Sequence, residues 1–215
     1  MFVLPLVQGW SSGVAVAADS ACEPHAIEEA RAAWSGAAAV VVRGLEAEVE
    51  VVAGAGDAVV VSGSACGDPA VSAVRRGDVI TVSAKRSRGA ALTLTVAVPS
   101  STPVLSVQEL TGDLVIHGVE ARVAVVSSVG TIDVTDAASL RIAYGAGDVS
   151  VDGLGGDLVV DRLAGVVTAR RVGGDVVADG VTGDVTVDDV AGDLAVRGSG
   201  GRVLPTNVRG TVDLP

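Results

Sequence analysis

Aspartates that follow glycine at regular intervals are the side chains in this sequence best placed to do chemistry. Such Gly-Asp pairs place Asp148, Asp157, Asp175, Asp184 and Asp193 at multiples of nine residues. Acidic nonapeptide repeats can bind calcium between coils, so Asp157, Asp175 and Asp193 form a candidate weak cation column. However, Val176 and Val177 follow Asp175 where the calcium motif requires further Gly and Asp. We therefore expect each aspartate to bond to nearby backbone amides in a turn, with cation binding as the alternative.

The sequence offers little support for a catalytic site. No serine of residues 19–215 lies in a G-x-S-x-G elbow, and the Gly54-x-Gly56 and Gly145-x-Gly147 pairs lack the helix of a dinucleotide site. We expect His117 to be a surface residue. Because the acids are distributed by repeat rather than clustered, we assign no catalytic residues and no cofactor. An enzyme that acts on polysaccharides from a β-helix is a remote alternative.

The two cysteines, Cys22 and Cys66, predict a disulfide and an oxidising compartment. With only His25 and His117 beside them, a zinc site lacks ligands. A bridge closing a loop of about 45 residues stabilises the fold by about 4 kcal/mol if its effect is the lost entropy of the unfolded chain. The alternative is that Cys22 carries a lipid.

A nine-residue repeat dominates the C-terminal half and must position these side chains. Glycine begins each unit at positions 147, 156, 165, 174, 183, 192, 201 and 210. Third places hold Val149, Leu158, Val167, Val176, Val185, Leu194, Val203 and Val212. Fifth places hold Val151, Val160, Ala169, Ala178, Val187, Val196, Pro205 and Leu214. Eighth places hold Leu154, Leu163, Val172, Val181, Val190, Ser199 and Val208.

This pattern predicts short strands joined by regular corners. Apolar third and fifth places give the two-residue alternation of a strand with one buried face. We expect the glycines to supply positive-φ corners. Strands that cannot bury their faces alone stack into a mostly parallel β-solenoid. Its narrow interior suits small aliphatic side chains, which agrees with an aromatic content of 2%.

The charges predict two nonapeptides per turn, with three as the alternative. Residues eighteen apart would then be direct neighbours, which places Arg170 between Asp152 and Asp188. The outward fourth places form one Ser/Thr column and one apolar stripe: Val159, Val177 and Ala195. This stripe is a candidate surface for a protein or glycan, although valine favours any strand and the stripe is small.

The N-terminal half has two further parts. Residues 1–18 resemble an export signal that ends in Ala15-Val16-Ala17-Ala18, although no Lys or Arg precedes the apolar stretch. Residues 19–107 are strand-rich and less regular, and we expect them to cap the solenoid of residues 108–215. We predict strands near 38–43, 46–52, 57–62, 70–74, 78–85, 90–98 and 103–107. Residues 26–34 could form one or two helical turns.

Composition excludes several partners. The formal net charge of −11 disfavours nucleic acid and anionic membranes, which attract basic surfaces. No apolar run approaches the ~20 residues of a membrane-spanning helix.

These features together resemble the family of bacterial putative adhesins, exported Gly-Asp-Val repeat proteins of unknown function. The resemblance rests on Cys22, on Cys66 in Gly63-Ser64-Ala65-Cys66, and on the repeats up to the terminal Gly210–Pro215 segment. It implies a β-solenoid, a periplasmic, envelope or secreted location, and no demonstrated enzyme activity. We therefore expect a non-catalytic envelope protein that acts as an adhesin-like interaction or structural module. The alternative function is a divalent-cation-binding repeat protein.

Overall fold

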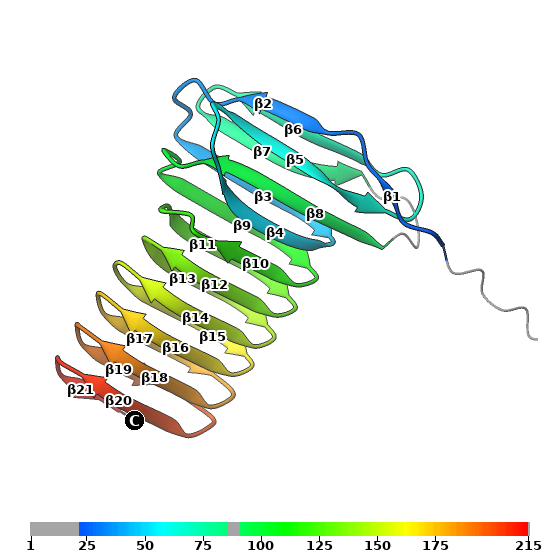
Figure 1. Ribbon diagram of the computed structural model, residues 1–215. Coiled ribbons are helices and arrows are strands. Elements are labelled where there is room, and N and C mark those ends of the chain that lie inside the picture. Colours follow the sequence, from blue (N-terminus) through cyan, green and yellow to red (C-terminus); the bar gives the residue numbers. More distant parts are fainter. Residues whose placement is uncertain (1–21, 86–90, 215) are drawn as a thin grey trace, which may run out of the picture.

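The protein is a two-sided β-solenoid with a cap at its N-terminal end (Figure 1). The computed structural model describes residues 22–85 and 91–214. The expected export signal over residues 1–18 lies outside the described residues. All regular elements described are strands, so the predicted all-β class is confirmed. Within the described ranges, no helix has the length and hydropathy to cross a membrane.

The strands form two sheets that face each other. The 11-stranded sheet has the order β1-β5-β8-β4-β10-β12-β14-β16-β18-β20, with β2 beside β5. Its strands are β1 His25–Ala26, β2 Ala30–Ala33, β4 Glu48–Gly54, β5 Ala58–Ala65, β8 Leu92–Pro99, β10 Leu114–His117, β12 Ile132–Ala137, β14 Val149–Leu154, β16 Val167–Val172, β18 Val185–Val190 and β20 Val203–Val208. The 10-stranded sheet has the order β21-β19-β17-β15-β13-β11-β9-β3-β7-β6. Its strands are β3 Ala39–Glu46, β6 Ala70–Arg76, β7 Val79–Lys85, β9 Val104–Thr111, β11 Arg122–Val129, β13 Ser139–Ala146, β15 Leu158–Ala164, β17 Val176–Val181, β19 Leu194–Arg197 and β21 Val212–Asp213.

Two nonapeptides make one turn, as the charges predicted. From β9 and β10 onward, successive strands of each sheet pair in parallel, and in all but one turn the partners are eighteen residues apart, such as Val149 with Val167 and Leu158 with Val176. The offset falls to seventeen between β12 and β14, where Ile132 pairs with Val149. This is the point at which the sequence lacks one residue between Gly130 and Gly147. The solenoid tolerates the shorter turn without losing its register.

The interior is filled by aliphatic columns. Third, fifth and eighth places from β14 to β18 are buried, and Leu158, Val160 and Leu163 of β15 are at most 1% exposed. Equivalent side chains on adjacent strands lie ~4.8 Å apart, so each new turn buries its apolar face on the previous one. The aliphatic core runs continuously from the cap into the repeats.

The seventh place explains why positions 3, 5 and 8 all point inward. A regular strand would turn position 8 outward because side chains alternate. The residue before each eighth-place side chain instead has a left-handed backbone, which reverses the alternation once per strand. These residues are Gly118, Ser127, Asp136, Tyr144, Gly153, Arg162, Arg171, Gly180, Asp189, Gly198 and Asn207.

The expectation of positive-φ corners at the first-place glycines is wrong for most of them. Only Gly147, with a φ of 131°, has this geometry among the eight first-place glycines from 147 to 210. The others are needed for space. A Cβ on Gly165 would contact the carbonyl oxygen of Gly147, and one on Gly183 would contact that of Gly165. The repeat therefore requires glycine because adjacent backbones approach closely at each corner.

Replacing Gly180 by valine is expected to destabilise the fold by about 1–3 kcal/mol, because a β-branched side chain is strained in the left-handed region. Gly180 has a φ of 65°. Gly180→Asn is the matched control, since asparagine adopts this conformation readily. Urea unfolding of both variants measures the difference. Equal losses for the two side chains would contradict the conformational explanation.

The cap replaces parallel with antiparallel pairing. Strands β3, β4, β7 and β8 already pair in parallel with the coil, whereas β5 runs antiparallel to β8, and β6 to β7. Short strands β1 and β2 then cover the outer edge of β5. The expectation of helical turns over residues 26–34 is wrong, because Ala30–Ala33 pairs with β5. Trp34, at 6% exposed, packs into the core that this arrangement closes.

The predicted disulfide is present. Cys22 and Cys66 are bridged, with their Cα atoms 5.7 Å apart. The bridge joins the segment before β1 to the end of β5 and so holds the edge strands in place. The proposed boundary at residues 107 and 108 stays a prediction.

Candidate functional site

The Gly-Asp aspartates form hydrogen-bonded ladders along both corners of the solenoid. One carboxylate oxygen of each accepts the backbone N–H of the residue eighteen positions later, on the next turn. The N···Oδ1 distances of these bonds are 2.7–2.9 Å. The pairs, with the donor first, are Thr131 and Asp113, Val166 and Asp148, Asp175 and Asp157, Asp193 and Asp175, Arg202 and Asp184, and Thr211 and Asp193. The expected role in binding backbone amides is therefore observed. Each aspartate links its own turn to the next.

These bonds favour the charged form of the carboxylates. Backbone hydrogen bonds from Thr131, Arg202 and Thr211 lower the pKa values of Asp113, Asp184 and Asp193 respectively. Asp184 gains a further contact, since Nη2 of Arg202 lies 2.9 Å from its Oδ2. The hydrogen bonds of the ladders therefore stabilise ionised aspartate at neutral pH.

Acidification is expected to lower stability steeply below about pH 4, the ordinary range of aspartate pKa values. A lowered folded-state pKa means that the stabilisation is complete above the unfolded-state pKa and is lost as the pH falls through the folded-state pKa. Thermal unfolding between pH 7 and pH 2.5 measures this loss. The triple variant D113N/D184N/D193N keeps an acceptor oxygen at each position, but its amides do not titrate. Its melting temperature should therefore fall less between pH 4 and pH 2.5 than that of the wild type. If the melting temperatures of the variant and the wild type fell equally with acid, the loss of stability would come from other titrating groups.

The candidate cation column lies within one of these ladders. Asp157, Asp175 and Asp193 stack on successive turns, as the sequence predicted, and each carboxylate accepts an amide N–H from the next turn. In residues 22–85 and 91–214, no three or more His, Cys, Asp or Glu side chains are grouped so that they could hold a metal ion. Cation binding by this column stays a prediction.

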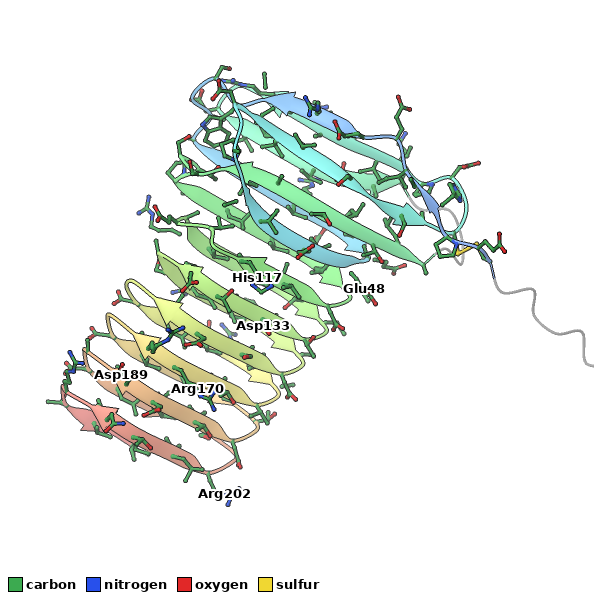
Figure 2. All side chains as sticks on the ribbon, in the orientation of Figure 1. Glu48, His117, Asp133, Arg170, Asp189 and Arg202 are labelled. Carbon is green, nitrogen blue, oxygen red and sulfur yellow. A yellow bond between two sulfur atoms is a disulfide. The ribbon has the colours of Figure 1, made fainter. Side chains whose placement is uncertain are left out.

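The outer face of the 11-stranded sheet carries polar side chains in register. An open groove of about 590 Å³ crosses β12, β14 and β16 and is lined by Asp133, Ser150, Asp152, Thr168 and Arg170, among others. His117 is exposed on the same face, above Asp133 and Arg170 (Figure 2). Nδ1 of His117 and Oγ1 of Thr135 lie 2.5 Å apart. The face offers hydroxyl, carboxylate and guanidinium groups in an open surface.

The column of Asp152, Arg170 and Asp188 has the predicted register, but Asp152 forms its ion pair with a different arginine. Arg170 pairs in the sheet with Asp152 on one side and Asp188 on the other. The nearest cation to Asp152 is nevertheless Arg171, whose Nε lies 2.6 Å from Oδ1. Arg171 occupies the left-handed seventh place, from which its side chain reaches back to the preceding turn. Sequence spacing identified the neighbouring strands, but the backbone conformation decides which arginine pairs.

The candidate apolar stripe is assembled on the outer face of the 10-stranded sheet. Val159, Val177 and Ala195 are consecutive partners in β15, β17 and β19, and all three are half-buried. Arg141 precedes them in the same column, and Asp213 follows. The stripe is therefore a narrow apolar strip bounded by charges.

A basic groove on the same sheet was missed by sequence reasoning. It lies over β3, β6 and β7, close to the cap, and contains Arg43 and Arg76. The two arginines are 33 residues apart in the sequence, outside the regular repeat. The parallel pairing of β3 with β7 and the antiparallel pairing of β7 with β6 together bring them to one face. For Arg43, the alternation with the buried Val40 and Val42 is the sequence signal that it points outward.

Neither a protein-family model nor a curated protein matches the sequence. Among solved structures, a "putative cell adhesion protein" from Clostridium sporogenes matches with a TM-score of 0.37 and 8% identity, over 89% of this chain and 98% of that chain. A "putative adhesin" from Bacteroides fragilis has a TM-score of 0.34 and 12% identity, over 88% and 96% of the chains. One from Parabacteroides merdae has a TM-score of 0.35 and 8% identity, over 86% and 95%.

Proposed function

We propose that this chain is a non-catalytic, exported protein of the cell envelope that acts as an adhesin-like interaction module. The observation that carries the proposal is the division between interior and surface. The interior is a continuous aliphatic core, while the outer faces of both sheets present side chains held in strict register. Such a scaffold offers a long, rigid surface to a partner.

The disulfide supports export, because such bonds persist in oxidising compartments. The proposed location is the periplasm or the cell envelope, or outside the cell. A surface of regular short corners supports binding rather than catalysis, since the acids of the Gly-Asp units already bond to backbone amides.

We assign the working surface to the outer face of the 10-stranded sheet. This face combines the stripe of Val159, Val177 and Ala195 with the basic groove near the cap. The two features lie apart on this face, with β13, β11 and β9 between them. Arginine is enriched in protein interfaces, which favours the basic groove as a contact surface. The partner is an envelope protein or glycan.

Co-sedimentation of the purified chain with insoluble bacterial envelope material tests the proposal. The wild-type chain should sediment with this material. V159E/V177E should sediment less, because two carboxylates then interrupt the apolar stripe. S150E/T168E is the matched control: it adds the same charge at outward fourth places of the other sheet and should behave as the wild type. Absence of wild-type binding would contradict the proposed function.

Divalent-cation binding is the second candidate, and the ladder of Asp157, Asp175 and Asp193 is the observation that favours it. Scanning calorimetry with and without millimolar calcium distinguishes the two candidates. We expect a small change in melting temperature, since the amide of the next turn already uses one oxygen of each carboxylate. A large rise would favour the cation-binding repeat protein.

A further inference from the structure

The basic groove is built from three adjacent strands of the cap end. Its volume is about 290 Å³, and it is open to solvent along one side. Its lining comprises Arg43 from β3, Ser72, Val74 and Arg76 from β6, and Thr81 and Ser83 from β7. The groove therefore contains two guanidinium groups, three hydroxyl groups and one apolar side chain, with no carboxylate.

Within residues 22–85 and 91–214, the two arginines of the groove have no carboxylate partner, in contrast to most arginines of the repeats. Five arginines of the repeats and one of the cap lie within 4.0 Å of a carboxylate: Arg162, Arg171, Arg197, Arg202 and Arg209 in the repeats, and Arg31 in β2. Among the described residues, no carboxylate lies within that distance of Arg43 or Arg76. The neighbouring Arg75 points to the other side, where its Nη1 donates to the carbonyl oxygen of Trp34 at 2.8 Å. A chain of net charge −11 thus leaves two free cations in one groove.

The sheet keeps these cations apart. Strand β7 lies between β3 and β6, so Arg43 and Arg76 are on strands about 10 Å apart. They are also staggered along the strands, because Arg76 pairs with Val79, whereas Arg43 lies one residue beyond the Val42–Val82 pair. This separation fits two anionic groups on one extended ligand better than a single small anion.

The floor between the arginines is suited to sugar rings. The hydroxyl groups of Thr81 and Ser83 lie on the central strand, and Val74 is 44% exposed beside them. Hydroxyl groups can exchange hydrogen bonds with sugar hydroxyls, while the valine contacts the C–H faces of a ring. The planar guanidinium group can bind a carboxylate through two parallel hydrogen bonds.

We propose that this groove binds an acidic polysaccharide, with uronate carboxylates at Arg43 and Arg76 and the intervening sugar on Thr81, Ser83 and Val74. This inference rests on the proposed envelope function and specifies its ligand. The bound chain would run diagonally across β3, β7 and β6. The electrostatic part of the interaction is exposed, so added salt should weaken it.

Titration calorimetry with a defined oligogalacturonate measures the interaction. The wild-type chain should bind, and R43Q/R76Q should bind at least tenfold more weakly with an unchanged melting temperature. R122Q/R170Q is the matched control, since it changes the net charge equally at two exposed arginines outside the basic groove of β3, β6 and β7. Among the described residues, no carboxylate lies within 4.0 Å of either arginine. The R122Q/R170Q variant should retain wild-type affinity at 50 mM salt. Binding by the wild type and by this control should weaken at 500 mM salt.

Three results would overturn the assignment: no wild-type binding, equal losses in both arginine variants, or inorganic polyphosphate binding as tightly as the oligogalacturonate. The last result would show that charge alone recognises the ligand. Co-sedimentation with envelope material keeps the two proposals distinct. If the wild-type chain still sediments while oligogalacturonate fails to bind, the envelope function stands and the acidic-polysaccharide site is wrong.

Discussion

Gly183→Ala should destabilise the solenoid by about 3 kcal/mol or more, the upper end of what overpacking a buried site usually costs. The N–H of Gly183 donates to the carbonyl oxygen of Gly165 at 2.9 Å. The new Cβ would contact that same oxygen and would lie 2.8 Å from the carbonyl carbon of Gly165 and 3.0 Å from Cγ2 of Val166. Backbone atoms cannot rotate away as a side chain can. Relief therefore requires the two turns to separate, which breaks the ladder bonds around them.

Gly155→Ala is the matched control, because it makes the same chemical change at a nearby corner. Its Cβ would lie 3.7 Å from the carbonyl oxygen of Ala138, an ordinary contact, and its φ lies outside the left-handed region. We expect a change within about 0.5 kcal/mol. Guanidinium unfolding followed by far-UV circular dichroism compares the two variants. A Gly183→Ala protein as stable as Gly155→Ala would contradict the close-packed corner.

Most of the solenoid could be predicted from the sequence because its interactions repeat. The nine-residue glycine spacing predicted short strands joined by regular corners, and opposite charges eighteen residues apart predicted two units per turn. Both follow from local alternation and from direct stacking of neighbouring turns. The missing residue between Gly130 and Gly147 reappears as a register of seventeen in the structure.

The role of individual repeat positions was harder to predict. The glycine spacing suggested positive φ at the first places, but of the glycines from 147 to 210 only Gly147 has it there. The left-handed residue of each unit is instead the seventh, which is as varied as Gly180, Arg162 and Asn207. The missed signal was the apolar pattern itself. Buried positions at 3, 5 and 8 require one reversal of side-chain direction, and the seventh place is one of only two sites where it can occur.

The cap and its surface could not be derived from periodicity. Residues 26–34 are alanine-rich and suit a helix, but the free edge of β5 recruits Ala30–Ala33 as an antiparallel strand. Tertiary pairing thus overrides local preference. The groove with Arg43 and Arg76 depends on the order β3-β7-β6, which places a later strand between two others. No local rule in the sequence specifies that order.

Loss of the Cys22–Cys66 bridge should destabilise the cap by about 4 kcal/mol, the entropy of closing a loop with a sequence separation of 44. Strand β1 has two residues and β2 has four, and among the described strands both pair with β5 alone. These few contacts are unable to hold the N-terminal segment alone. Hydrogen exchange of C22S/C66S should show faster exchange in β1, β2 and β5, with protection unchanged in β14 to β18.

The bridge should also control association between molecules. When β1 and β2 leave, the edge of β5 presents unpaired backbone groups, and such edges recruit strands from other chains. Size-exclusion chromatography at increasing concentration should therefore show larger species for C22S/C66S than for the wild type. G155A is a suitable folded control because its substitution leaves the cap intact. If C22S/C66S unfolded in a single transition together with the repeats, without aggregation, the cap would be an integral part of one cooperative unit rather than a separately stabilised closure of the solenoid.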